Sequence, residues 1–538
     1  MSTLVPSLAA RPRGPFVLRV AAALAFVLLW QVLAGLAPDL TPALGADPAA
    51  AQATRPRTAV MIGDDFFSGE AGRWKGNAGW TAKNSHGTDI AMRYDANAWP
   101  SRWTFEPTLA YTPDSWSNGC RRSLSSPLVS MFEGHMSVGE LQKGINIACS
   151  GAQSKHVWGY AAGGTAFKGE QPQTAQLYNI AATHDVKLIL VGIGANDLGL
   201  QDALSTCKLA YMNAHGWVTQ KPWIGDHCSD DLRESHEPRL STVRANVMKS
   251  VDLVRATMAQ RGYSSTDYRL VVVGYPGVLS PHNRYQWPEK DRRYSGCMFR
   301  DSDSEYVNET LVRKLNAHLH AATHLKGTEF LDITQVLNGH RLCESGTFRP
   351  SGWQVPSAAT SEWVRWDEND PSDRYRPNVY GQQAIGRCMR LAWLSPVGQF
   401  GCLGSPNTTP AGVRLVDGRP LKVVSSTVQT ITANLGKTPL TRDLGVTGNP
   451  YSPADMAIVD VEVDAPYHHL LSISVRRPDG KIQTVQAKSA STGAGRRTHR
   501  ALVTAPANPN GTWQVRIANH GQFSSQNATL HRVTLTQY

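Results

Sequence analysis

Residues 57–403 alternate between short apolar runs and segments with a helical period. Between these runs, apolar residues recur at spacings of three and four over 240–258, which predicts an amphipathic helix that Gly262 can end. Helices are also expected over about 303–325 and 378–391. The runs short enough for buried strands are 58–62, 186–193, 268–273 and 329–333. This alternation predicts a three-layer α/β domain with a parallel sheet.

The pattern changes near residue 425. From there to residue 538, short runs alternate apolar and polar positions without a helical period, which predicts an all-β sandwich. The stretch 404–412 is rich in turn-forming residues and poor in apolar ones, so we interpret 404–424 as a linker.

The first 53 residues have the features of an export signal. Arg11, Arg13 and Arg19 precede an uncharged apolar run, and small residues ending in Ala51-Gln52-Ala53 form an A-x-A cleavage site. This indicates a secretory signal peptide over 1–53, although the run is also long enough for an uncleaved membrane anchor. Either alternative places the remaining chain outside the cell.

Composition and charge narrow the class of protein. The 538 residues are 41% hydrophobic and 18% charged, which excludes a disordered or collagen-like chain. The formal net charge is +11, and residues 404–538 hold 14 basic against 7 acidic residues. The C-terminal quarter therefore carries most of the excess positive charge.

Cysteine usage agrees with export, because the eight cysteines are even in number and form no C-x-x-C pair. We expect disulfides and no zinc site. Eight cysteines allow about 105 connectivities, and the spacing favours pairing each cysteine with the next along the chain. The cysteines, in that order, are Cys120, Cys149, Cys207, Cys228, Cys297, Cys343, Cys388 and Cys402.

Polar loops follow the ends of the predicted strands. Residues 63–72 follow the first strand, 194–197 follow the second, 146–152 lie between them, and 373–378 open the last helix. Because ligands of open parallel sheets bind at the carboxyl ends of the strands, we expect these loops to form the functional site.

At these loops the chain resembles the SGNH (GDSL) hydrolases, in particular their secreted, disulfide-bonded actinobacterial esterase and lipase branch. The resemblance covers about 57–403 and includes segment 118–123, the Cys-Ser-Gly-Ala turn at 149–152 and the order of the cysteines. It implies a flavodoxin-like domain with a nucleophilic Ser in the first loop. It also implies a His base with an orienting Asp in the last loop, and an oxyanion hole completed by a Gly and an Asn.

Two positions depart from that pattern. Gly151 and Asn196 match the oxyanion hole and Asp373 matches the orienting acid, but Asp65 replaces the nucleophilic Ser and Arg376 replaces the His. Arginine stays protonated, so Arg376 cannot act as a base. A carboxylate beside a guanidinium compensates charge, and we therefore expect an Asp65–Arg376–Asp373 ion network with impaired or absent catalysis. One sequence shows no history, so natural and engineered replacement both remain open.

The C-terminal residues 425–538 resemble the P domain, the β-sandwich that follows the catalytic domain of proprotein convertases. The match rests on 455–463, 471–480, 510–517 and 530–535, but His468-His469 stand where that family often has Gly-Asp. The basic residues of this part are either a solvated face, which we favour, or a binding surface for anionic polymer. They are Arg476, Arg477, Lys481, Lys488, Arg496, Arg497 and Arg500.

Three functions remain open. The first is a secreted binding protein whose pocket holds an acyl ester or an acylated or anionic cell-surface glycan or polymer. The second is a working esterase or lipase with a variant mechanism, which requires Ser68 or a loop histidine within about 3 Å of the pocket. The third is a cell-wall-associated module that acts through its basic C-terminal domain. We expect no cofactor, metal or nucleic acid, and a monomer that contacts a membrane only if residues 1–53 stay attached.

Overall fold

The computed structural model describes residues 55–77, 88–95, 97, 102–215, 227–294, 296–350, 357–366, 373–447, 456–486, 493–506 and 508–538. The predicted signal segment 1–53 and Lys488 lie outside these ranges. Within them, no helix combines the length and apolarity needed to cross a membrane.

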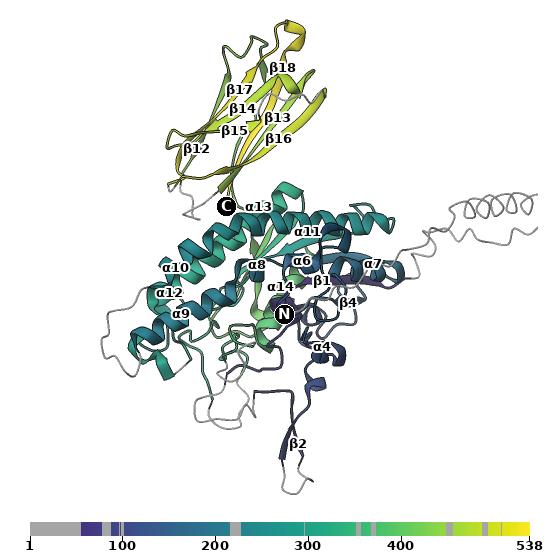
Figure 1. Ribbon diagram of the computed structural model, residues 1–538, viewed down its shortest axis with the longest axis vertical. Helices are drawn as coiled ribbons and strands as arrows, with labels where there is room; N and C mark the ends of the chain where they lie inside the picture. The colour runs from purple at the N-terminus through teal and green to yellow at the C-terminus, as the bar shows by residue number, and fades with distance from the viewer. Residues whose placement is uncertain are drawn as a thin grey trace, which may run out of the picture. The chain divides into compact units, whose positions relative to one another are not determined.

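A mostly parallel sheet forms the centre of the first part of the chain (Figure 1). Pairing is parallel from β4 through β8, and β9 closes the far edge antiparallel to β8. The strands, in spatial order, are β4 (Lys143–Asn146), β1 (Arg57–Gly63), β5 (Asp185–Gly192), β6 (Arg269–Val273), β7 (Glu329–Gln335), β8 (Phe400–Leu403) and β9 (Arg414–Asp417). The four strands predicted from apolar runs are all present as β1, β5, β6 and β7.

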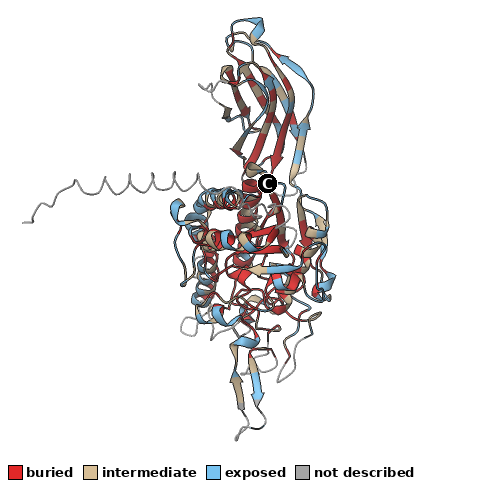
Figure 2. Cartoon of the chain, turned by 90° about the vertical axis from the view of Figure 1, so that its right-hand side faces the viewer, coloured by how far each residue is buried: buried red, intermediate tan, exposed pale blue. Residues whose placement is uncertain are grey.

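Helices cover both faces of this sheet. Phe330 of β7 stacks on His320 of α13 (Arg313–Lys326), while the next residue, Leu331, lines the same small cavity as Met389 of α14 (Val379–Leu394). Successive strand residues point to opposite faces, so α13 and α14 lie on opposite sides of the sheet. Helices α7 (Gln173–Thr183) and α11 (Leu240–Gln260) accompany α13, and α5 (Pro127–Met131) accompanies α14. Figure 2 shows the strands between these layers as buried.

The predicted helices are present with sharper boundaries. Gly262 follows α11 in the left-handed conformation, with φ of 83°. The helix expected over 303–325 consists of α12 (Asp301–Glu305), a π-helical turn (Tyr306–Val312) and α13. Asn378 caps α14 by accepting hydrogen bonds from the Tyr380 and Gly381 amides. Other helices that sequence periodicity did not identify are α7, α9 (Leu200–Ala214) and α10 (Cys228–Ser235).

The sequence suggested that 404–424 is a linker, but the structure places strands of both domains in this segment. Strand β9 belongs to the parallel sheet, and buried Val413 joins its core. Strand β10 (Leu421–Ser425) already belongs to the β-sandwich. The turn-rich residues 404–412 instead reverse the chain between β8 and β9, and only 418–420 separate β9 from β10.

Two antiparallel sheets form the C-terminal β-sandwich. Its core includes Trp513, Ile473 and Val461, all fully buried. One sheet has the order β10-β18-β13-β16 with β11 beside β18, and the other β12-β17-β14-β15. The remaining bounds are β11 (Gln429–Ile431), β12 (Leu440–Val446), β13 (Met456–Ala465), β14 (Leu471–Arg476), β15 (Ile482–Gln486), β16 (Gly495–Thr504), β17 (Gly511–Asn519) and β18 (Ala528–Gln537). The predicted all-β region is therefore present; its resemblance to the P domain stays a prediction.

Carboxylates neutralise much of the basic cluster on the sandwich. Arg477 pairs with Asp479, and Arg500 on β16 pairs with Asp460 of β13 at 2.5 Å. Glu462 accepts ion pairs from both Arg496 and Arg532. The choice between a solvated face and a binding surface for anionic polymer stays a prediction.

Four disulfides pin the α/β part, and each joins a cysteine to the next one in sequence, as predicted. The pairs are Cys120–Cys149, Cys207–Cys228, Cys297–Cys343 and Cys388–Cys402. Two of them join regular elements, because Cys207 of α9 bonds to Cys228 at the start of α10 and Cys388 of α14 bonds to Cys402 of β8.

Candidate functional site

The ends of three neighbouring strands bring the predicted site residues together. Strand β1 ends at Gly63, and Asp65 begins the short helix α3 (Asp65–Ser68). The turn that carries Gly151 continues beside β1, because the Cys149 amide donates to the Gly63 carbonyl at 3.0 Å. On the other side of β1, β5 leads into α8 (Ala195–Leu198), which carries Asn196.

Close main-chain packing fixes the turn between β1 and α3. A Cβ atom on Gly63 would lie 2.6 Å from the Gly192 carbonyl oxygen, so only glycine fits there. The Gln173 amide group binds both main-chain groups of Gly63 at 2.8 Å. Asp64 then caps α3 through the Phe66 amide and accepts a hydrogen bond from the Tyr275 hydroxyl at 2.6 Å. Asp65 is thereby held on a rigid support.

Asp65 and Arg376 form a buried ion pair at the predicted nucleophile and base positions. The Arg376 Nε contacts Asp65 Oδ2, and the two side chains are 5% and 1% exposed. Asn196 donates to Asp65 Oδ1 at 2.6 Å and to the Ala152 carbonyl at 3.1 Å. A side-chain amide has two N–H hydrogens, so these two acceptors use both.

Arg376 is held as firmly as its partner. Its Nη1 donates to Gln201 Oε1 at 2.7 Å, and its guanidinium lies 4.7 Å from the centre of the Phe66 ring. These contacts hold a permanent cation where acyl transfer needs a group that accepts and returns a proton.

Two main-chain donors near this ion pair stay open. In the part of the chain that the structure describes, neither the Asp65 nor the Gly151 main-chain N–H has a hydrogen-bond acceptor. Asp65 is the first residue of α3, where an N–H has no partner within the helix. Gly151 is exposed and has a φ of 79°. Gly151 lies on an exposed turn, where its N–H can meet a ligand oxygen, whereas Asp65 is only 1% exposed.

Asp373 belongs to a second network. The Trp74 indole donates to its Oδ2 at 2.7 Å, and Arg73 and Arg121 approach it at 3.5 and 3.6 Å. The Arg365 guanidinium lies 3.5 Å from the centre of the Trp74 ring and so packs against the residue that donates to Asp373. Among the described residues, the cations beside Asp373 are thus Arg73 and Arg121 and not Arg376, so the predicted Asp65–Arg376–Asp373 network is correct only for its Asp65–Arg376 part.

Glu70 is a buried carboxyl group in the first loop to which the sequence assigned no role. It is 4% exposed and accepts a hydrogen bond from the Ser150 hydroxyl at 2.7 Å. Burial and, next, the negative charge of Asp65 raise the pKa of Glu70 to about 7. Glu70 and Ser150 both lie within the loops singled out in the sequence, but their contact spans 80 residues.

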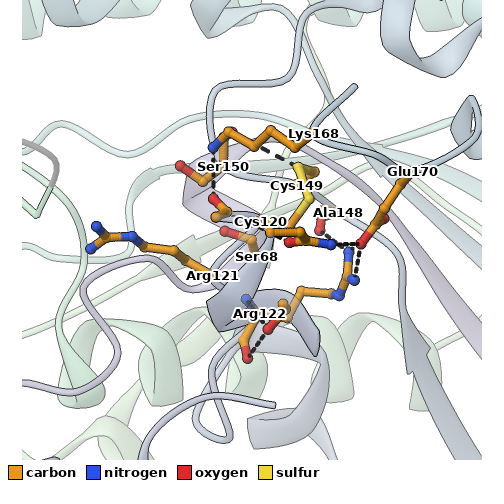
Figure 3. Close-up of a disulfide and its surroundings, with 12 residues drawn as sticks. Ser68, Cys120, Arg121, Arg122, Ala148, Cys149, Ser150, Lys168 and Glu170 are labelled. Atoms are coloured by element: carbon orange, nitrogen blue, oxygen red, sulfur yellow. Dashed lines mark hydrogen bonds and ion pairs between the residues drawn. A yellow bond between two sulfur atoms is a disulfide. The ribbon is translucent and has the colours of Figure 1, made fainter. Parts of the chain in front are cut away.

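Figure 3 shows how the Cys120–Cys149 disulfide joins the two loops around Ser150. The Lys168 ammonium donates to the Ser150 carbonyl at 2.7 Å and to the Gly119 carbonyl at 2.6 Å. Arg121 and Lys168 both have positive φ, 51° and 50°, which is uncommon for residues with a side chain. Burial lowers the pKa of Lys168.

Comparison with known proteins gives structural likenesses only. No protein-family model matches this chain, and neither does any curated protein. Among solved structures, the extracellular lipase of Streptomyces rimosus has 17% identity and a TM-score of 0.35, covering 63% of this chain and 100% of that one. Phospholipase A1 of Streptomyces albidoflavus has 18% identity and a TM-score of 0.34, with coverage of 63% and 100%. A family two carbohydrate esterase of Clostridium thermocellum has 11% identity and a TM-score of 0.27, with coverage of 62% and 63%. At TM-scores this low, the chemistry of the site rests on its own residues.

Proposed function

We propose that this chain is an exported SGNH-type esterase or lipase homologue whose inherited triad is inactive, and that its site binds an acylated or anionic surface ligand. The residues at the strand ends support the family assignment, because Gly151, Asn196 and Asp373 keep the family's pattern around the replaced Asp65 and Arg376. The four disulfides agree with an exported protein.

The observation that carries this proposal is the engagement of Asn196 by the Asp65 carboxylate. In an esterase of this family, the Asn amide stabilises the negative oxygen that develops during acyl transfer. Here that amide already binds a fixed carboxylate and the Ala152 carbonyl. Asp65 is in turn neutralised by Arg376, so the inherited nucleophile and base positions bind each other.

Ligand binding remains possible through other donors. The main-chain N–H groups of Asp65 and Gly151 suit a carbonyl or carboxylate oxygen. Arg121 adds a partly exposed cation near them, with 24% of its side chain accessible. We therefore propose an acyl ester, or an acylated or anionic glycan or polymer of the cell surface, as the ligand.

Hydrolysis of p-nitrophenyl butyrate by matched variants tests the inactive triad. We expect Asp65→Ala, compared with the native chain at pH 8.5 and shown to be folded by circular dichroism, to keep the native rate, because the Asp65 carboxylate takes no part in acyl transfer and Glu70 is ionised in both proteins at this pH. The double variant Asp65→Ser/Arg376→His restores a nucleophile and a base, and general base catalysis of this kind contributes about 10²–10⁴-fold. Asp65→Ser alone is the matched control, because it supplies a nucleophile without the base. A native rate that falls on Asp65→Ala would overturn the proposal.

A further inference from the structure

Ser150 lies beside a carboxyl group that can act as a base, which the inherited nucleophile position at Asp65 lacks. The Ser150 hydroxyl donates to Glu70 Oε1 at 2.7 Å, within the distance required between a nucleophile and its base. Ser68, the hydroxyl considered from the sequence, is fully buried, and among the described residues its hydroxyl donates to the Asp65 main-chain oxygen at 3.3 Å and to no side chain. We propose that Ser150 is an acyl-accepting nucleophile for carboxylic esters, with the Glu70 carboxylate as its base. This inference does not rest on the proposed function.

Glu70 is oriented by groups other than Ser150. The Tyr111 hydroxyl donates to the Glu70 carbonyl, and the Glu70 amide donates to the Asp65 carbonyl at 3.2 Å. Arg121 Nε lies 4.0 Å from Glu70 Oε1. A base whose main chain and carboxylate are both held loses little freedom when it accepts a proton.

The surroundings of Ser150 suit an ester carbonyl. Ser150 itself is 5% exposed, but the next residue, Gly151, is exposed and offers its open N–H to the carbonyl oxygen. Lys168 holds the Ser150 carbonyl, and the Ser150 amide donates to the Cys120 carbonyl at 3.0 Å. The disulfide, Lys168 and Glu70 together fix the nucleophile from three sides.

The charges around Glu70 make it basic enough for this role at neutral pH. Burial and the carboxylates of Asp65 and Asp373 raise its pKa, while Arg376 and the Ser150 hydroxyl lower it, and the result is about 7. Arg121 lies beside Glu70, and Lys168 lies on the far side of Ser150. A base with a pKa near the working pH is effective in proton transfer.

The chemical step balances with these groups alone. Ser150 Oγ attacks the carbonyl carbon while its proton passes to the Glu70 carboxylate. The new bond joins Oγ to the acyl carbon, the bond from that carbon to the ester oxygen breaks, and the departing alkoxide takes the proton from Glu70. The alcohol leaves and Ser150 carries the acyl group.

A p-nitrophenyl alkylphosphonate tests this step on the full chain. It mimics the ester, reacts with an activated serine and releases one coloured p-nitrophenolate for each phosphorus–oxygen bond formed on the protein. We expect one equivalent of colour and one adduct, located on Ser150 by mass spectrometry of peptides. The labelling rate should rise between pH 6 and pH 8 as Glu70 loses its proton.

Three variants separate this role from a structural hydrogen bond. Ser150→Ala should abolish labelling. Glu70→Gln keeps an acceptor for the hydroxyl but removes the base, and should slow labelling about 10²-fold or more. Ser68→Ala is the matched control and should label at the native rate. The absence of an adduct, an adduct on another residue, or equal rates in the native chain and Glu70→Gln would overturn the inference. None of these outcomes alters the Asp65→Ala test above.

Discussion

Replacing Glu70 with Gln should make the protein more stable at alkaline pH than the native chain. The native carboxyl group is 4% exposed, and its pKa is raised from 4.5 to about 7, mainly by burial and then by Asp65. The folded chain therefore binds this proton more tightly than the unfolded chain does. Stability from Glu70 is complete below pH 4.5 and is lost as the pH rises towards 7. Gln has no such titration and keeps an acceptor for Ser150.

The size of the effect follows from the pKa difference. One pKa unit corresponds to about 1.4 kcal/mol, so the native chain loses about 3 kcal/mol by pH 8 relative to Glu70→Gln. At pH 5 Glu70 is still protonated in the folded chain, and the difference in free energy of unfolding between Glu70→Gln and the native chain should be below about 1 kcal/mol. Urea unfolding of both proteins at 25 °C with the disulfides intact, repeated from pH 5 to pH 8.5, measures this difference.

Glu170→Gln provides a control of opposite sign. Its ion pair with Arg122 keeps the pKa of Glu170 below its ordinary value despite partial burial. Glu170→Gln should therefore be less stable than the native chain at neutral pH. If the free energy difference between Glu70→Gln and the native chain is the same at pH 5 and pH 8.5, Glu70 titrates as an ordinary carboxyl group and the reasoning fails.

Two further predictions concern the ion pair and the disulfides. Asp65→Ala leaves Arg376 buried without its carboxylate, which should lower the free energy of unfolding in urea by about 3–5 kcal/mol. Sodium formate should restore part of that loss, whereas the same concentration of sodium chloride should not. Equal effects of the two salts would contradict the pairing. Cys388→Ala/Cys402→Ala opens a link between residues 14 apart, and the free energy of unfolding should fall by about 3 kcal/mol; an unchanged urea midpoint would show that the link does not constrain the unfolded chain.

The parallel sheet was predictable because its central strands are covered on both faces. Such strands are largely continuous apolar runs, as β1, β5 and β6 are, whereas Asp332 interrupts the apolar run of β7. The edge strand β9 has no such signal, because half-exposed residues and pairing with β8 define it. Pairing with β8 therefore determines the structure of a segment that we interpreted as a linker from its sequence.

The candidate site also has one feature that the sequence predicted and one that it did not. The residue types at positions 65 and 376 predicted a charge pair, and the structure places their side chains in contact. The role of Glu70 could not be predicted, because its pKa depends on burial and on the carboxylates of Asp65 and Asp373 from distant segments. Sequence spacing locates the loops that meet at a sheet edge, but it does not specify which side chains touch.

The order of the disulfides also bears on how this chain matures. Since the cysteines bond in consecutive pairs, a chain oxidised from its N-terminus onward has the correct partner of each new cysteine as the nearest open thiol. Cys343 is the one residue with a competitor at similar distance, because Cys388 is about as far along the chain as Cys297. During emergence Cys297 comes first, and later the short loop to Cys402 captures Cys388. Oxidative maturation of this protein should thus require little disulfide isomerisation.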